Sequence, residues 1–191
     1  MRRVHVTGGP GSGKTTLAQR VGVLLDAPVY EMDWVGWERD TGRERTVEEK
    51  LERVHGIAAQ ETWVTEGTML GWTDALLRAA DLVIWLDVPW PVAVWRMLLR
   101  HVRAELRRAN PHPGWRRLAR FAWYTRHYYL DLQVGPPVPA DGEGRATRAR
   151  TAARVSALGA RGVRCRTSRD VASLLASIAQ AARPSSAVDP R

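Results

Sequence analysis

Residues 8–15 of this 191-residue chain read Gly-Gly-Pro-Gly-Ser-Gly-Lys-Thr and match the pattern G-x-x-x-x-G-K-[ST] at every fixed position. Glycines let the backbone curl so that successive N–H groups point at one anion, and a helix that follows adds its positive dipole end. Lys14 is predicted to reach the β- and γ-phosphates of a nucleoside triphosphate, and Thr15 to offer its hydroxyl to Mg²⁺. The predicted ligand is therefore ATP with Mg²⁺. The residues predicted to contact it in this segment are Gly8, Gly9, Pro10, Gly11, Ser12, Gly13, Lys14, Thr15 and Thr16.

Carboxylates stand where predicted strands end, and ligands of open parallel sheets bind at that edge. Glu31 and Asp33 alternate at the end of the second strand, so only one of them can point into the cleft unless the backbone is locally distorted. We predict Asp33 to be a general base or acceptor ligand, because a carboxylate in this role orients a hydroxyl and takes its proton late. The alternative for Asp33 is a turn or a helix cap. Asp87, after the fourth strand, is either a second metal ligand or a structural partner of the phosphate-binding loop.

The elements that must position these side chains alternate between strand and helix along the whole chain. Strands are predicted at residues 4–6, 28–30, 63–65, 82–86 and 163–166, and helices at 14–25, 46–60, 73–79, 91–108, 115–130, 146–158 and 168–182. Thr46 and Glu49 form a predicted capping box, and Thr73 and Ser168 are predicted helix caps. Residues 110–114 and 135–144 are predicted breaks. This alternation predicts an α/β protein with a five-stranded parallel sheet, helices on both faces, and an arginine-rich helical lid.

Length and composition fit one domain over residues 1–183, with a lid-like segment at about 101–130 and a flexible tail at 184–191. The net charge is +9, and Lys14 and Lys50 are the only lysines, so arginine supplies the excess. Such a chain suits nucleotides, nucleic acid or an acidic partner. The single cysteine, Cys165, excludes an intramolecular disulfide, and no segment is apolar enough to span a bilayer. A cytoplasmic protein is expected, while the sequence leaves its oligomeric state open.

Several of these residues resemble the adenylate kinases and their relatives. Asp87-Val88-Pro89 at a strand end, followed by Arg96 and Arg100, resembles that family in residue types and spacing. The resemblance implies that Arg96 lies against the adenine and that Arg100 contacts the ATP phosphates. Glu66-Gly67 resembles the acidic-Gly step after the third strand, which implies that Glu66 helps to hold Mg²⁺ through water. Shikimate-kinase-like relatives also place an acidic pair where Glu31 and Asp33 stand.

Other positions depart from adenylate kinases and resemble a smaller group. The arginines that grip an acceptor nucleotide in that family are missing from residues 66–71 and 33–36, which argues against AMP as the acceptor. The loop, the step Met32-Asp33-Trp34-Val35-Gly36-Trp37 and the step Trp63-Val64-Thr65-Glu66-Gly67 are similar to the DNA topology modulation (FlaR-like) proteins. That resemblance spans nearly the whole chain but implies no particular reaction.

Three functions remain open at this point. The first is a kinase with catalytic Lys14, Asp33 and Arg100 and an unidentified small-molecule acceptor. The second is a regulatory, nucleic-acid-associated ATPase, because arginines interleave with aromatics over residues 115–130, although these aromatics are predicted to pack inward and the segment to act as a lid. The third is a nucleotide sensor without turnover. Trp34 and Trp37 are predicted to line the acceptor site or to lie in the core.

Overall fold

The computed structural model describes residues 1–68, 71–107, 114–132 and 146–182. Five parallel strands form one sheet in the order β2-β3-β1-β4-β5. The strands are β1 (Arg3–Gly8), β2 (Val29–Glu31), β3 (Trp63–Glu66), β4 (Leu82–Leu86) and β5 (Gly162–Cys165). In register, Glu31 pairs with Glu66 and Gly8 pairs with Leu86. The sheet therefore brings the ends of β1, β2 and β3 to one edge, together with the residues that follow them.

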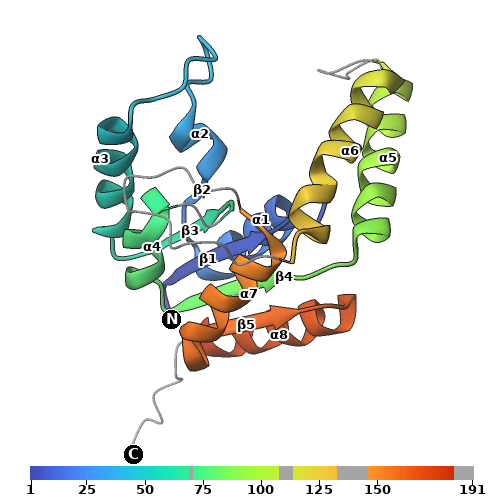
Figure 1. Cartoon of the computed structure of the whole chain (residues 1–191). Coiled ribbons are helices and arrows are strands. Elements are labelled where there is room, and N and C mark those ends of the chain that lie inside the picture. Colours follow the sequence, from blue (N-terminus) through green and yellow to red (C-terminus); the bar gives the residue numbers. More distant parts are fainter. Residues whose placement is uncertain (69–70, 108–113, 133–145, 183–191) are drawn as a thin grey trace, which may run out of the picture.

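Helices cover both faces of the sheet, and two of them stand beyond its carboxyl edge (Figure 1). The helices are α1 (Lys14–Leu25), α2 (Met32–Gly36), α3 (Val47–Ala58), α4 (Asp74–Ala79), α5 (Trp90–Leu106), α6 (Trp115–Leu130), α7 (Arg148–Ala157) and α8 (Ser168–Ala182), with single 3-10 turns η1 (Gly71–Thr73) and η2 (Gly159–Arg161). Helices α5 and α6 lie side by side and rise from the sheet opposite α2 and α3 (Figure 1).

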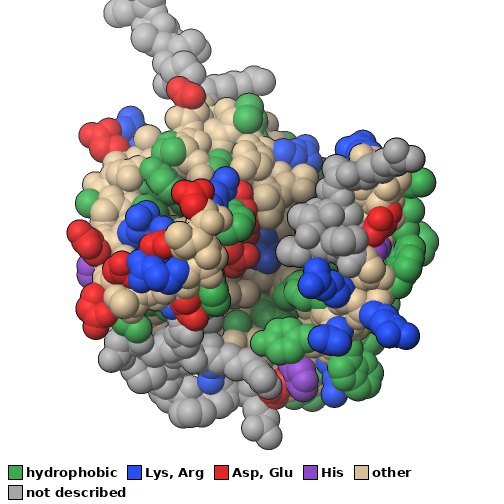
Figure 2. Space-filling view, turned by 90° about the horizontal axis from the view of Figure 1, so that it is seen from above, with side chains coloured by type: hydrophobic (Ala, Val, Ile, Leu, Met, Phe, Trp, Pro, Cys, Tyr) green, Lys and Arg blue, Asp and Glu red, His purple; other side chains and the backbone are tan. Residues whose placement is uncertain are grey.

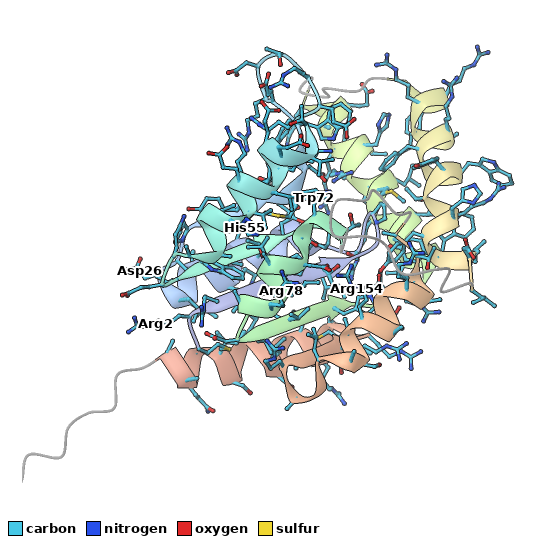
Figure 3. The ribbon with its side chains drawn as sticks, turned by 60° about the vertical axis from the view of Figure 1, so that its left-hand side comes forward. Arg2, Asp26, His55, Trp72, Arg78 and Arg154 are labelled. Atoms are coloured by element: carbon cyan, nitrogen blue, oxygen red, sulfur yellow. The ribbon has the colours of Figure 1, made fainter. Side chains whose placement is uncertain are left out.

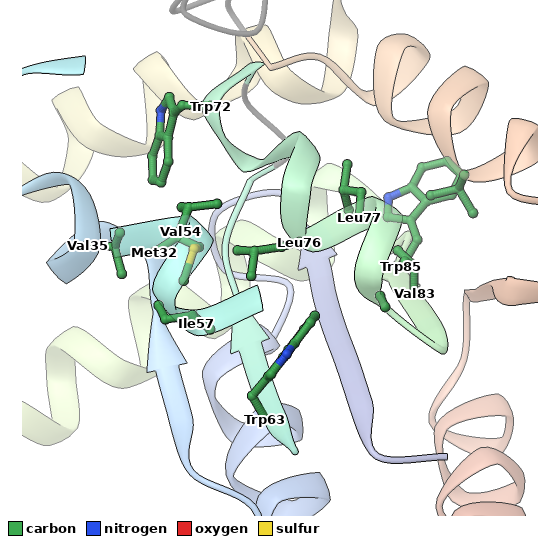
Figure 4. Packing of buried hydrophobic residues seen from close by; sticks show 12 residues of the cluster. Met32, Val35, Val54, Ile57, Trp63, Trp72, Leu76, Leu77, Val83 and Trp85 are labelled. Carbon is green, nitrogen blue, oxygen red and sulfur yellow. The ribbon is translucent and has the colours of Figure 1, made fainter. Parts of the chain in front are cut away.

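Alternation along the strands builds a core on each face. Val4, Val6 and Ile84 point to the face covered by α1 and α8. Trp63 and Trp85 point to the other face and pack with residues of α3, α4 and α7 (Figure 4). Burying each such large side chain contributes about 2–3 kcal/mol. The protein therefore has three layers, helices on a parallel sheet on helices, as the strand–helix alternation predicted.

Ion pairs tie the outer helices together around this core. Arg154 of α7 forms an ion pair with Asp74 at the start of α4, and both side chains are partly exposed. Figure 3 shows Arg154 and Arg78 on these neighbouring helices. Helix α7 is thus attached to α4 as well as to the sheet. This attachment fixes the position of α7, whose Arg148 forms a hydrogen bond with Asp87.

Most predicted elements are found, and the differences have local causes. Residues 32–36 form the unpredicted helix α2, a single short turn. The cap of α8 is Thr167, one residue earlier than predicted: the Thr167 hydroxyl accepts from the Asp170 N–H, and the Asp170 carboxylate accepts from the Thr167 N–H. Thr73 makes no capping hydrogen bond to α4, whereas Thr46 and Glu49 form the predicted capping box.

Three predictions cannot be placed on this fold. The predicted break at 110–114 falls mostly outside the described residues, and the loop at 135–144 and the tail at 184–191 fall wholly outside them. Within the described part of the chain, no helix combines the length and the apolar character needed to cross a membrane.

Candidate active site

The loop between β1 and α1 has the backbone that its glycines allow. Gly11 and Gly13 have φ angles of 78° and 101°, in the region that side chains with a Cβ rarely adopt. Gly13 lies directly before α1, which begins at Lys14 as predicted. The Ser12 N–H donates to the Gly9 carbonyl at 3.2 Å and closes the turn. The loop therefore leads straight into a helix N-terminus, an arrangement that can hold phosphate oxygens.

Lys14 is buried at the centre of this arrangement. Its ammonium group donates to the Gly9 carbonyl at 3.4 Å. Burial lowers the pKa of Lys14, and the Arg100 guanidinium lowers it further, while the carboxylates of Glu66 and Asp33 act in the opposite direction. All three of these charged groups are thus close enough to Lys14 to influence its ionisation. The structure therefore brings together the predicted catalytic residues Lys14, Asp33 and Arg100.

Thr15 and Glu66 form the candidate metal site. The Thr15 hydroxyl donates to Glu66 Oε1 at 2.6 Å, across from the loop to the end of β3. Burial raises the pKa of the Glu66 carboxyl, against the effects of the Thr15 hydrogen bond and of Lys14. Among the described residues, no three His, Cys, Asp or Glu side chains gather as metal ligands. A hydroxyl and one carboxylate suit Mg²⁺, which takes few protein ligands and completes its shell with waters and phosphate oxygens.

Glu31 and Asp33 both line the cavity beside the loop, which a continuous strand would not allow. The reason is that β2 ends at Glu31 and α2 begins at Met32. The alternation of an extended strand therefore does not continue to Asp33. Glu31 also lies 3.9 Å from the Arg39 guanidinium, whereas no such ion pair is found for Asp33 within the described residues.

One cavity of about 1140 Å³ joins these groups to the helix pair α5–α6. It is lined by residues 10–17 of the loop and α1, by the acids at the ends of β2 and β3, and by Arg100, Arg103 and Arg107 of α5. Phe121 contributes from α6, and residues 165–168 with Val171 and Ala172 from the start of α8. Figure 2 shows the hollow between the helix pair and the rest of the molecule.

Both helices of the pair hold carbonyl groups of the phosphate-binding loop. From α5, Arg96 Nη1 donates to the Ser12 carbonyl at 2.6 Å, and from α6 the Tyr129 hydroxyl donates to the Pro10 carbonyl at 2.7 Å. In a planar trans peptide the carbonyl and the next N–H point in opposite directions. These two hydrogen bonds therefore also fix the directions of the N–H groups of Gly11 and Gly13.

The packing of Tyr129 against the loop requires that residue 9 has no side chain. A Cβ added at Gly9 would lie 2.5 Å from atoms of Tyr128 and of Tyr129, closer than real contacts allow. Tyr128 and Tyr129 pack edge to face at 5.0 Å, and the Tyr128 hydroxyl also donates to Thr151 Oγ1 at 3.2 Å. The base of α6 is thus packed directly against the loop.

Both carboxylate oxygens of Asp87, the second metal candidate, are hydrogen-bonded to arginines. Its side chain is 1% exposed, and its oxygens accept hydrogen bonds from Arg148 of α7 and Arg164 of β5. These hydrogen bonds lower the pKa of Asp87 against the effect of burial. Asp87 does not line the cavity, and it joins α7 and β5 to β4 rather than supporting the phosphate-binding loop.

The large aromatics also differ from expectation. Trp34 and Trp37 are 42% and 45% exposed and do not line the cavity, so they form neither core nor an acceptor wall. On α6, Trp123 and Tyr124 are 63% and 62% exposed, whereas the predicted inward packing holds for Tyr128 and Tyr129. Most of the arginines that line the cavity come from α5. The others are Arg20 of α1 and Arg166 between β5 and α8, and no arginine of α6 lines the cavity.

Among the residues that sequence reasoning missed at this site are Tyr129, Arg103 and Arg107. A signal existed for the two arginines, because they follow Arg100 by three and seven residues and so share its helix face. No sequence signal distinguishes Tyr129 from the other aromatics of α6.

Comparisons with known proteins support the fold. No protein-family model matches the chain. The uncharacterized protein YqaC of Bacillus subtilis (strain 168) is 27% identical over 101 residues, which cover 52% of this chain and 56% of that protein, so the chain matches about half of that relative's length. The solved structure of a shikimate kinase from Acinetobacter baumannii in complex with shikimate has a TM-score of 0.53 at 14% identity, over 95% of this chain and 92% of that one.

A second solved structure agrees with the first. A gluconokinase from Sinorhizobium meliloti 1021 has a TM-score of 0.51 at 16% identity, over 94% of each chain. At these identities the likeness concerns the fold. Together with the loop, the sheet order and the layers, it defines this chain as a three-layer α/β protein of the P-loop type.

Proposed function

We propose that this protein is a kinase that transfers the γ-phosphate of ATP to a hydroxyl group of a small molecule. The observation that carries the proposal is that Asp33 lies in the same cavity as the phosphate-binding loop and influences the ionisation of Lys14. A carboxylate close to the site of the γ-phosphate suits a group that orients an attacking hydroxyl. The two solved structures of similar fold, a gluconokinase and a shikimate kinase, agree with such a reaction.

Each residue then has a defined task. The N–H groups of the loop and Lys14 bind the β- and γ-phosphates, and Arg100 neutralises the charge that develops on the transferred group. Thr15 would hold Mg²⁺ directly and Glu66 through water, and the metal would supply charge neutralisation at the phosphates. Asp33 accepts the hydroxyl proton. We also propose that Arg96 stays close to the nucleoside while it holds the loop, and that α5–α6 acts as the lid of a single domain.

The first experiment offers ATP, Mg²⁺ and pooled hydroxyl compounds to the purified protein and follows ADP release and new phosphorylated masses. Asp33→Asn should lower kcat about 10²–10⁴-fold with little change in the KM for ATP, because the base is lost and the phosphate site is kept. Lys14→Ala should abolish turnover, and a thermal melt checks that it folds. Full turnover in either variant would contradict the assignment of that residue.

A second function, a nucleic-acid-associated ATPase, is favoured by one observation. Helix α6 contains no Asp or Glu, and its exposed Trp123 and Tyr124 lie among arginines, with Arg126 stacked 3.3 Å over the Trp123 ring. Stacking aromatics with arginines can bind single strands. This function also agrees with the resemblance to DNA topology modulation proteins. ADP release without a phosphorylated product, joined to strand binding that weakens steeply with salt, would support it over the kinase.

A further inference from the structure

The cavity has two chemically different ends. Near the start of α8 its lining includes Val171 and Ala172, with Thr167 and Ser168, a partly apolar surface that suits a nucleoside. The other end is lined by the acids Glu31 and Asp33 on one side and by the upper part of α5 on the other. Helix α5 rises away from α8 as it leaves the sheet (Figure 1). Because Asp33 is the proposed acceptor ligand, the space between Asp33 and the upper part of α5 is the candidate acceptor end.

Four arginines along α5 line the cavity, and the first of them, Arg96, is hydrogen-bonded to the Ser12 carbonyl. Arg100, Arg103 and Arg107 share one helix face, and Arg107 lies about 10 Å further along the axis than Arg100. Arg100 influences the pKa of Lys14, so it belongs to the phosphate end. No hydrogen bond or ion pair of the Arg103 and Arg107 guanidinium groups is found within the described residues. Two cationic groups thus face the acceptor end without a carboxylate partner.

The net charge of the cavity lining also favours a second anionic ligand. Among the described residues that line the cavity, seven are Lys or Arg and three are Asp or Glu, which leaves an excess of four positive charges. ATP with bound Mg²⁺ offsets only part of this excess, because the metal cancels part of the triphosphate charge. Unmatched like charges that line one open cleft repel one another, and a second anion relieves that repulsion.

We propose that the acceptor carries an anionic group, a carboxylate or a phosphate, and that Arg103 and Arg107 bind it while its hydroxyl faces Asp33. This inference rests on the proposed kinase function. Guanidinium groups bind both anions through paired hydrogen bonds, so the two arginines select charge and fix the orientation of the hydroxyl. A neutral acceptor of the same shape leaves both arginines unpaired.

The test offers the protein pairs of acceptors that differ only in the anionic group. Sugar acids are paired with the neutral sugars, hydroxy acids with their amides, and phosphate monoesters with the parent alcohols, so that the carboxylate and phosphate arms are separate. The expected result is a phosphorylated product from the anionic member of a pair at a kcat/KM at least tenfold higher. Equal or preferred use of the neutral members would overturn the inference and leave the kinase intact. No product from any member would overturn the kinase proposal itself, and the inference with it.

Variants then test the two arginines on the best anionic acceptor. Arg103→Gln and Arg107→Gln should each raise the KM for the acceptor about 10- to 100-fold, the usual loss of a charged hydrogen bond, and change the KM for ATP less than twofold. Arg53→Gln, an exposed arginine of α3 outside the cavity, removes the same charge and should change neither constant. A raised KM for ATP with an unchanged KM for the acceptor would assign the arginines to the nucleotide and refute the inference.

Discussion

Replacing Gly9 by Ala tests whether α6 is seated on the phosphate-binding loop. The added Cβ would lie 2.5 Å from Tyr128 Cδ1 and from Tyr129 Cζ and Oη. The φ angle of Gly9 is not positive, so the substitution introduces no backbone strain of that kind and its effect is steric. Because two rigid rings are the obstacle, either the loop or the base of α6 must move, and the Tyr129–Pro10 hydrogen bond of 2.7 Å is then lost.

The magnitude follows from these contacts. Overpacking of this kind costs about 1–3 kcal/mol, and the lost hydrogen bond about 1 kcal/mol. The smaller conformational entropy of unfolded Ala offsets about 0.4–1 kcal/mol. The free energy of unfolding should therefore fall by about 2 kcal/mol, which corresponds to a decrease in Tm of about 4–8 °C for a chain of this size. Because the loop is displaced, ADP binding should weaken as well.

Urea denaturation and a fluorescence titration with ADP measure the two effects. Gly56→Ala is the matched control, because a Cβ at Gly56 meets nothing within 4 Å and the residue lies inside α3. This control should gain about 0.5–1 kcal/mol and leave ADP binding unchanged. In a Tyr129→Ala background the Gly9→Ala penalty should shrink, since one of the two rings is gone. If Gly9→Ala has the stability and the ADP affinity of the wild type, the close packing of α6 against the loop is refuted.

Three further predictions concern titratable groups. Asp87→Asn should lower the free energy of unfolding by about 2 kcal/mol in urea, because it weakens the charged hydrogen bonds between a buried carboxylate and two partly exposed arginines. A changed Mg²⁺ requirement for nucleotide binding would instead make Asp87 a metal ligand. Burial raises the pKa of Glu66, so protons should compete with Mg²⁺ at a higher pH than they do at an ordinary Glu. Nucleotide binding titrated with Mg²⁺ over a series of pH values above the ordinary Glu range should show this competition, and Glu66→Gln should flatten it. Burial lowers the pKa of His5 to about 3, so the unfolded chain binds the proton first and stability should fall as the pH drops from about 6.5 towards 3; an equal slope in His5→Gln would contradict this.

Local signals in the sequence were sufficient for much of the fold. The glycine pattern predicted both the loop and the start of α1 at Lys14, and the capping pair predicted the start of α3. The helical pattern of residues 115–130 predicted the bounds of α6. In these cases the residues that decide the structure are neighbours in the chain.

The parts of the fold and site that the sequence did not predict depend on contacts between residues far apart in the chain. Helix α2 is too short to be stable alone, and Arg45 supports its end by donating to the carbonyls of Trp34 and Trp37. Asp87 is paired with arginines 61 and 77 residues away, which no local pattern reveals. Tyr129 meets Pro10 across 119 residues. The candidate site was therefore predictable at the loop and at the strand ends, and not where α5 and α6 meet the loop.

The hydrogen bonds from Arg96 and Tyr129 to the loop carbonyls have a thermodynamic consequence. Any displacement of α5–α6 that breaks them releases the peptide groups whose N–H directions they fix, and so lowers the affinity of the loop for phosphate. Linkage is reciprocal, so phosphate in the loop must favour the seated helix pair by the same factor. Phosphate binding in the loop and the position of α5–α6 are therefore thermodynamically coupled. A spectroscopic probe on the exposed face of α6 would report nucleotide binding from outside the cavity.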